Sequence, residues 1–370
     1  MKDSDKTGGG RISIPPLHAI GNLVLDAFFA PETDGGTDTR LELPSGPVHV
    51  PAEEFDTWWN ELPREHTVMR AGGAPGNVAR ALAALDTPCI VHGIVGRDCA
   101  GERYRELLSE AGVILASDSQ PGVATGRSVT HYRPHRADDA RLRLQPPPPL
   151  SLPFWEQFLS AVETASGTGS TPGVVYIDGY LIGTALHRAR DHGGERRGRS
   201  HHMEPQDIVT AVAHLRELGF ALALDLAHWA IAAAAPDTIL AAIHTVLGSA
   251  PGSVVFAKPE ELEPLGGLQA VLTQRLRGGE TYRGALVLKE GALGCSVFAP
   301  RLGDGSDGPF EPVPYRGVPT DTVEATGRGD CFAAGWLASA LRGRPLYECA
   351  AAAYRAGALC SAVPGAMLTS

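Results

Sequence analysis

Short apolar segments recur along the chain, and segments of helical character separate them. Clear examples are "GVVYIDGYL" at 173–181, "FALALDL" at 220–226, "SVVFAKPEEL" at 253–262 and "GALVLKEGALG" at 284–294. Strands that are buried on both faces of a parallel sheet show continuous apolar runs rather than alternation, and helices must connect them. The pattern therefore predicts an α/β fold: a doubly wound, mostly parallel sheet flanked by helices.

Two stretches interrupt this pattern, residues 27–70 and 114–145, where alternating segments such as "LELPSGPVHVP" and "GRSVTHYRPHR" occur. We interpret them as β excursions from the edge of the main domain that form a discontinuous lid. The polar, glycine-rich residues 188–206 predict a surface loop, and residues 1–12 predict a disordered tail. We expect residues 13–370 to form a single domain.

Charge and apolar content limit the function classes. The net charge of −10 argues against nucleic-acid binding, and 43% apolar residues suffice for a large core. The N-terminal segment is polar where a secretory signal needs an apolar stretch, and Asp225 and His228 interrupt the longest apolar windows, so we expect neither export nor membrane insertion.

Cysteine and histidine spacing gives no sign of a zinc site. The six cysteines are scattered, without a CxxC pair, which predicts a reducing, cytoplasmic location. His201 and His202 are adjacent and would face apart on regular structure, which disfavours a metal role. The cysteines are Cys89, Cys99, Cys295, Cys331, Cys349 and Cys360.

The segment "ATGRGDCFAAG" at 325–335 runs from a glycine-rich turn into small and apolar residues typical of a packed helix. Such a turn presents unpaired backbone N–H groups together with the positive end of the helix dipole, which makes an anion site. Gly327 and Gly329 supply the permissive backbone, and we expect the helix to begin at Asp330. Asp330 then either caps the helix or lies beside the bound anion.

Several motifs in order resemble those of the ribokinase-like (PfkB) carbohydrate kinase family, over about His18 to Ala366. A single motif of this kind would be weak evidence for the family, whereas several motifs in the family's order are specific evidence for it. The motifs are "GNLVLD", "GGAPGNVARALAAL", "GIVGRDCAGERYRELLSEAGV", "FAKPEELE", "VEATGRGDCFAAG" and "SAVPGA".

The resemblance implies a kinase that transfers the γ-phosphate of ATP to a hydroxyl of a small molecule. Asp330 would act as the base, and the N–H groups of Gly327, Arg328 and Gly329 would form the anion hole. A helix N-terminus should lower the pKa of a carboxylate. A base with a low pKa can still serve, because phosphoryl transfer asks mainly for positioning and charge stabilisation.

The resemblance also implies a sugar-binding set. Asp26 and Asn77 would hold hydroxyl groups, and Gly72 and Gly73 would allow close approach to the backbone. From the residues alone, Asp26 is equally well a turn residue at a strand end, and Asn77 a helix N-cap. Asp178 lies near the carboxyl end of a predicted central strand, the side on which such sheets bind ligands.

On the nucleotide side, the resemblance places Lys289 and Gly291 near ATP. Lys289 stands where the family has threonine, and it either contacts phosphates or points to solvent. Ala356, Gly357 and Gly365 would leave room for the adenine ring, although helix packing explains Ala356 and Gly357 equally well.

Three departures from the family pattern affect ion binding. Glu260 replaces the asparagine of the Asn-x-x-Glu magnesium motif, whereas Glu263 keeps its place. Glu324 and Ala325 replace the acid and threonine that precede the anion hole, which alters any monovalent-cation loop. Arg328 opposes the helix dipole, so it either carries a positive charge toward ATP or a phosphorylated substrate, or faces solvent.

Two function classes stay open. The first is a magnesium- and ATP-dependent kinase for a sugar, sugar derivative or nucleoside, acting on a primary hydroxyl. The second is a ligand-binding or scaffolding relative that has lost efficient turnover. A dinucleotide-dependent oxidoreductase and a P-loop kinase are disfavoured, because neither GxGxxG after a strand nor GxxxxGK[ST] is present.

Substrate identity is open at this point. Phe28 and Phe29 either stack on a base or belong to the core of the lid, and four arginines either receive a substrate phosphate or form a solvated strand face. Members of the family often pair through the lid, so the resemblance makes a homodimer through the lid one option, which the sequence does not decide. The arginines are Arg133, Arg136, Arg141 and Arg143.

Overall fold

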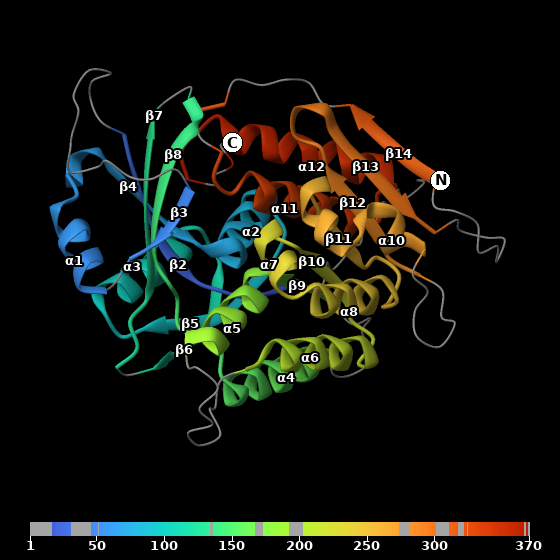
Figure 1. The fold of residues 1–370 in the computed structure, drawn as a ribbon, viewed down its shortest axis with the longest axis horizontal. Helices are drawn as coiled ribbons and strands as arrows, with labels where there is room; N and C mark the ends of the chain where they lie inside the picture. Colours follow the sequence, from blue (N-terminus) through green and yellow to red (C-terminus); the bar gives the residue numbers. More distant parts are fainter. Residues whose placement is uncertain are drawn as a thin grey trace, which may run out of the picture.

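A nine-stranded sheet occupies the centre of the computed structural model of this chain (Figure 1). Its strand order is β14-β13-β12-β11-β10-β9-β1-β5-β6, in which neighbours from β12 to β6 are parallel, and β13 and β14 are antiparallel. The strands are β1 (Leu17–Ile20), β5 (Cys89–Gly96), β6 (Ile114–Gln120), β9 (Val174–Asp178), β10 (Ala221–Asp225), β11 (Val254–Ala257), β12 (Ala285–Lys289), β13 (Gly294–Ala299) and β14 (Glu311–Arg316). The structure describes residues 17–30, 46–50, 52–120, 122–133, 136–166, 173–191, 203–273, 282–300, 311–316, 322–323, 325–365 and 368.

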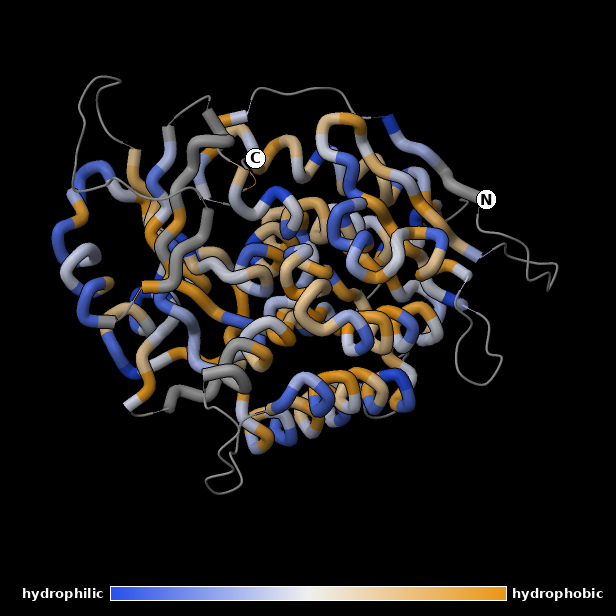
Figure 2. Tube along the Cα trace, viewed as in Figure 1, coloured by the Kyte–Doolittle hydropathy of each residue, from blue (hydrophilic) through white to orange (hydrophobic). Residues whose placement is uncertain are grey.

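Helices cover both faces of this sheet. Alternate strand residues enter two separate cores: Leu222 and Leu224 pack on one side, and Ala223 on the other. Apolar residues accordingly gather where helices meet the sheet (Figure 2). One layer holds α2 (Gly73–Ala84), α3 (Cys99–Glu110), α11 (Arg328–Ala340) and α12 (Leu346–Ser361). The other holds α4 (Leu152–Ser166), α5 (Tyr180–Asp191), α6 (Pro205–Glu217), α7 (Trp229–Ala234), α8 (Pro236–Leu247), α9 (Pro259–Leu262) and α10 (Gly267–Thr273). The predicted doubly wound fold is confirmed.

A second, five-stranded sheet lies at one end of the main sheet, at the left of Figure 1. Its outer face packs on α1 (Ala52–Glu61) through a small core that includes Phe29 and Phe55. This sheet forms the lid. Its strands, in the order β3-β8-β7-β2-β4, are β3 (Gly46–His49), β8 (Arg136–Gln145), β7 (Gly126–Arg133), β2 (Val24–Phe29) and β4 (Thr67–Gly72).

The lid differs in extent from the predicted excursions. Residues 114–120 form β6, which pairs with β5 in the main sheet, so the second excursion begins only with β7. The first excursion is not all β, because it contains α1 and the 3-10 helix η2 (Arg64–His66). Ile114 follows a helix and a turn as any main-sheet strand does, and its register with Ile90 continues the parallel order.

The apolar stretch "HAIGNLVLDAF" at 18–28 divides into two strands at Gly21. β1 enters the main sheet, and β2 enters the lid, so Asp26 lies within a lid strand rather than at the end of a main-sheet strand. The predicted tail, residues 1–12, lies outside the described residues, as does 192–202 of the predicted loop; α5 and α6 occupy the ends of that range. None of the described helices combines the length and apolar character needed to cross a bilayer.

Candidate active site

The carboxyl ends of three main-sheet strands bring charged groups to one edge. Asp178 ends β9, Asp225 ends β10 and Lys289 ends β12. Parallel strands end at the same edge of a sheet, which is where open α/β sheets bind ligands. The N-terminus of α11 lies at this edge, because Gly329 is in the vicinity of Lys289 and Asp225.

The glycine-rich turn forms the start of α11. The helix begins at Arg328, two residues before the predicted start at Asp330, and Gly327 is its N-cap with a left-handed φ of 74°. The N–H of Arg328 donates to the carbonyl of Ala325 at 3.2 Å. Within the described residues, no hydrogen bond uses the N–H groups of Gly327 or Gly329. Two of the three predicted anion-hole donors are therefore open, and the donor from Arg328 is engaged.

Asp330 is not a helix cap. It is the third residue of α11, and its carboxylate accepts a hydrogen bond from the Asn77 side-chain amide at 2.8 Å. Burial raises the pKa of Asp330 to about 7, with the Asn77 hydrogen bond opposing this and nearby Asp225 adding to it. The expected lowering by the helix dipole is thus wrong, because desolvation and a second carboxylate outweigh it.

Asn77 is likewise not an N-cap. It lies inside α2, whose N-cap is Gly72, so the alternative based on helix capping fails. Its amide nitrogen contacts Asp330, and its amide oxygen accepts a hydrogen bond from Arg80 at 3.4 Å. Asn77 therefore links the substrate motif to the residue predicted as the base.

Lys289 forms an ion pair beside the glycine-rich turn at the start of α11. Its ammonium group lies 2.7 Å from both carboxylate oxygens of Asp225, and both side chains are nearly buried. Burial lowers the pKa of Lys289, but Asp225 and Glu261 more than offset this, so the net pKa is raised and the lysine stays charged. Neither predicted alternative, phosphate contact or solvent exposure, included this partner.

Asp225 is the functional candidate that the sequence interpretation missed. It appeared only as an interruption of an apolar run, although its position as the last residue of a buried strand was the available signal. Asp178, at the matching position of β9, is fully buried, and burial raises its pKa well above the ordinary range. One of its carboxyl oxygens has no hydrogen-bond partner among the described residues.

The substrate motif is assembled around Asp26 in the lid. The Asp26 carboxylate accepts a hydrogen bond from the Ser128 hydroxyl at 2.5 Å and lies against Gly72 so closely that any Cβ there would overlap it. Gly73 has a φ of 72°, and a Cβ at this position would overlap the Asn22 carbonyl. Both glycines are thus required by close contact, and Asp26 is held in place rather than mobile in a turn.

A cavity of about 650 Å³ adjoins the glycine-rich turn at the start of α11, and Ala325, Arg328 and Gly329 are among the residues that line it. Lys289, Gly291 and Gly357 line it, as predicted for a nucleotide site. Ala356 and Gly365 do not. Ala356 packs against α11, within 2.8 Å of where a Cβ on Gly335 would lie, and Gly365 packs against the lid.

The Arg328 side chain belongs to the wall of this cavity. Its Nε donates to the Ser361 hydroxyl at 2.6 Å, and its Nη2 donates to the Thr322 hydroxyl at 2.9 Å. It therefore ties the start of α11 to the end of α12 and to the segment before the anion hole. Glu324, in the altered cation loop, lies outside the described residues, and Ala325 is exposed.

The two predicted magnesium ligands differ in position. Glu260 lines the cavity, whereas Glu263 is an exposed residue at the start of η3 (Glu263–Leu265) and does not line it. The part of the chain that the structure describes contains no group of three or more acidic, cysteine or histidine side chains that could hold a metal ion. Magnesium usually keeps several waters and takes one or two carboxylates plus substrate phosphates, so a single carboxylate on the cavity wall, such as Glu260, is compatible with it.

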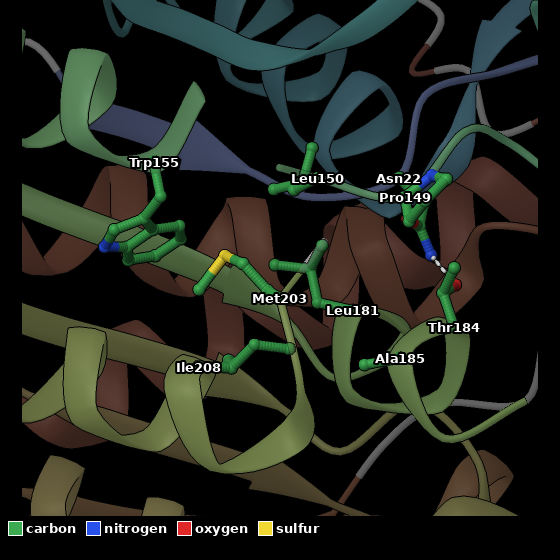
Figure 3. A pocket seen from close by; sticks show the side chains of 9 residues that line it. All are labelled: Asn22, Pro149, Leu150, Trp155, Leu181, Thr184, Ala185, Met203 and Ile208. Atoms are coloured by element: carbon green, nitrogen blue, oxygen red, sulfur yellow. Dashed lines mark hydrogen bonds between the residues drawn. The ribbon is translucent and has the colours of Figure 1, made fainter. Parts of the chain in front are cut away.

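A second cavity, lined by Asn22, Trp155 and Met203 among others, has a volume of about 10 Å³ (Figure 3). This is room for roughly one water, so it is not a substrate site. The residues that line it carry several polar groups. The Asn22 amide nitrogen donates to the Thr184 hydroxyl at 2.7 Å, whereas Asn22 Oδ1 and Trp155 Nε1 have no hydrogen-bond partner among the described residues. The cavity lies in the core between the sheet and the α4–α6 layer.

The aromatic pair in the lid does not provide a free stacking surface. Phe28 and Phe29 are 1% and 5% exposed. Phe29 belongs to the lid core, as the lid-core alternative has it, whereas Phe28 packs against Gly365 on the other face of β2. The side chains of Arg133, Arg136, Arg141 and Arg143 lie outside the described part of the structure.

The fold is that of the ribokinase-like sugar and nucleoside kinases. The pfkB family carbohydrate kinase model matches residues 58–131 and 207–370. The chain belongs to this family. Similar solved structures share 17–20% sequence identity with it, which shows the fold alone.

Three of these structures cover nearly the whole chain. A probable sugar kinase from Rhizobium etli has a TM-score of 0.70 at 17% identity over 96% of each chain. An adenosine kinase from Sinorhizobium meliloti has 0.69 at 20%, also over 96% of each. Adenosine kinase from Schistosoma mansoni, in complex with adenosine and AMP, has 0.70 at 18% over 97% of this chain and 99% of that one.

Curated relatives match only a part of the chain. The bifunctional protein HldE of Nitrobacter hamburgensis is 36% identical over 119 residues, which is 31% of this chain and 20% of that protein. HldE of Alkalilimnicola ehrlichii is 36% identical over 121 residues, 31% of this chain and 21% of the relative. The chain thus spans about a fifth of the length of these relatives.

Proposed function

We propose that this protein is an ATP- and magnesium-dependent kinase that phosphorylates a hydroxyl, a primary one, of a sugar, sugar derivative or nucleoside. The observation that carries the proposal is the position of Asp330. It lies at the start of α11, is held by Asn77, and neighbours the open N–H groups of Gly327 and Gly329. A base and an anion site thus lie together at the meeting point of the substrate motif and the large cavity.

The proton of the acceptor hydroxyl moves to the Asp330 carboxylate. A pKa of about 7 suits a general base, because it combines a useful ionised fraction at neutral pH with a real affinity for the proton. The Asn77 amide orients the carboxylate, and Asp26 accepts hydrogen bonds from other hydroxyls of the acceptor.

Positive charge and N–H donors stabilise the transferring phosphoryl group. The N–H groups of Gly327 and Gly329 point from a helix N-terminus, where the dipole adds to their effect. Lys289 holds a fixed charge close to Gly329, with Asp225 fixing its position. Because this charge is ordered before substrate arrives, no reorganisation is needed during transfer.

The large cavity is where ATP would bind. Its volume of about 650 Å³ lies within the range of nucleotide-sized ligand pockets. Lys258 and Lys289 line it, and they offer cations to phosphate groups. When bound, magnesium would neutralise phosphate charge, and Glu260 is the carboxylate placed to hold it.

The experiment is an ADP-release assay with magnesium and ATP over a panel of sugars, sugar derivatives and nucleosides, followed by identification of the phosphorylated hydroxyl. D330N should lose turnover by about 100-fold or more while still binding ATP. D237N, which changes an exposed aspartate at the start of α8, serves as the matched control and should retain activity. Full activity in D330N would contradict the assignment of the base.

A ligand-binding or scaffolding role is the second candidate. It is favoured by the Arg328 N–H, which donates to Ala325 rather than standing open as an anion-hole donor. A binder would gain thermal stability from the panel compounds without releasing ADP. The cytoplasmic location, the monovalent-cation requirement and the homodimer through the lid stay predictions.

A further inference from the structure

Arg70 lies on the face of the lid that carries Asp26. The two residues are direct partners in the antiparallel pairing of β4 with β2, so their side chains share one face of the sheet. Gly365, near the end of α12, covers this face: a Cβ on Gly365 would lie 2.7 Å from Cγ of Arg70 and 2.9 Å from the Phe28 ring. Arg70 is half-buried between lid and main domain.

The Arg70 guanidinium has no acidic partner in the described structure. Its Nη1 donates only to the neighbouring Met69 carbonyl, at 3.3 Å, and its buried Nε has no hydrogen-bond partner. Burial lowers the pKa of Arg70, and the nearby positive charge of Arg80 lowers it further. A half-buried cation beside a like charge is costly unless an anion offsets it.

The charge of Asp26, the cross-strand partner of Arg70, does not offset the lowering of the pKa of Arg70. Asp26 leans toward Ser128 and over Gly72, which is two positions along β4 from Arg70. Arg80 is engaged elsewhere, donating to the Asn77 amide oxygen and to the Gly365 carbonyl at 3.1 Å. The lid face next to Asp26 therefore keeps a positive charge and an unused N–H donor.

We propose that Arg70 binds an anionic group, phosphate or carboxylate, on the acceptor substrate, so that the acceptor is a phosphorylated or acidic sugar rather than a neutral one. This proposal rests on the proposed kinase function. Asp26 accepts the hydroxyls of such a substrate, and the Arg70 guanidinium donates to its oxyanion with a planar, forked geometry. Discrimination follows because only an anionic acceptor supplies the partner that this buried donor lacks in the free protein.

The test compares matched acceptors in calorimetric binding and in ADP release. The pairs are ribose with ribose 5-phosphate, fructose with fructose 6-phosphate and with fructose 1-phosphate, and glucose with gluconate; the phosphate and carboxylate arms distinguish the two anions. At least one anionic member should bind about tenfold or more tighter than its neutral partner. R70M should remove that advantage by a similar factor and leave the affinity for neutral sugars unchanged.

Two further variants separate recognition from folding. R64M, at an exposed arginine of η2 just before β4, should behave as the wild type. R70K keeps the charge but loses the fork, so it should retain only a part of the advantage. If R70M fails to fold, as judged by circular dichroism and thermal melting, the preference for the anionic acceptor is compared between R70K and the wild type instead.

The outcomes for Arg70 and for the kinase function are distinct. Tight binding of an anionic sugar without ADP release supports anion binding by Arg70 and contradicts the proposed kinase activity. ADP release with neutral acceptors, and no preference for any anionic member, supports the kinase and overturns the Arg70 site. Equal binding of the anionic sugar to R70M and wild type, or no binding of any anionic sugar, also overturns it.

Discussion

The ammonium group of Lys289 lies 2.7 Å from both carboxylate oxygens of Asp225, at the edge where the anion-binding turn begins. A Cβ on Gly329 would lie 3.4 Å from this ammonium group. The two charges come from the ends of β12 and β10, strands that β11 separates. Lys289 therefore counteracts part of the rise in the pKa of Asp330 that Asp225 causes, and it places a cation beside Gly329.

Replacing Lys289 by methionine should impair catalysis more than ATP binding. K289M leaves Asp225 buried beside Asp330, and the added repulsion raises the pKa of Asp330. We expect kcat/KM to fall by about 100-fold at pH 7 and to recover in part at higher pH. Steady-state kinetics from pH 6 to 9 measure this. A profile that keeps the wild-type midpoint would exclude the electrostatic role.

The partner variant controls for folding. D225N/K289M removes both charges, so it should be more stable than K289M by roughly 1–3 kcal/mol, since no unpaired charge stays buried. Denaturant titration compares the two. Equal stability of the single and double variants would show that a group other than Lys289 compensates the buried negative charge of Asp225.

The rate should depend on the ionisation of Asp330. With its pKa raised to about 7 by burial, the carboxylate is the base above this pH and a neutral acid below it. We expect kcat/KM to fall about tenfold per pH unit well below the midpoint and to level off above it. D330N should abolish this fall in kcat/KM at low pH together with the activity. A rate that is flat from pH 5 to 8 would contradict the assignment.

Gly72 should tolerate no side chain. A Cβ on Gly72 would overlap Asp26, so G72A must displace the carboxylate that is expected to hold the acceptor. We expect the KM for the acceptor to rise by about tenfold or more, with little change in the KM for ATP. D26N provides a comparison, because it keeps the packing and removes the charge. An unchanged acceptor KM in G72A would show that Asp26 does not bind the acceptor.

The architecture was predictable because buried parallel strands are apolar throughout. The segments at 173–181, 220–226, 253–262 and 284–294 contain β9, β10, β11 and β12. The division of the apolar stretch at 18–28 into two strands at Gly21 was not predictable. Both halves are equally apolar, and only tertiary pairing places one in the main sheet and the other in the lid. Residues 114–120 were misassigned to the lid for a related reason, since an edge strand has a weaker apolar signal.

The site was predictable to the level of motifs but not of contacts. Motif order pointed to Asp330, Asn77, Gly72 and Lys289, because each motif is a local sequence pattern; the structure brings Asn77 to Asp330 and Lys289 to Gly329, and their roles stay predictions. The pairing of Lys289 with Asp225 joins residues 64 positions apart, and no local pattern encodes it. The raised pKa of Asp330 depends on burial by several elements, so the helix dipole alone gave the wrong sign.

Arg328 is expected to act through the position of its helix. Its guanidinium ties α11 to Ser361 at 2.6 Å and to Thr322 at 2.9 Å, and its own N–H closes the turn onto Ala325. R328M keeps the turn's backbone but removes both ties, so Gly327 and Gly329 lose their support. We expect kcat to fall by about tenfold and the affinity for ATP to weaken, because Arg328 also lines the cavity.

A double-mutant cycle with S361A distinguishes a tie from a direct contact with nucleotide. If the Ser361 hydrogen bond mediates the effect, S361A and R328M should be non-additive in kcat, with a coupling of roughly 0.5–3 kcal/mol. If Arg328 instead contacts ATP phosphates alone, the two changes should add, and only R328M should weaken ATP binding. Unchanged kcat and ATP affinity in R328M would rule out both roles, and the family's small residue at this position would then be functionally equivalent to arginine here.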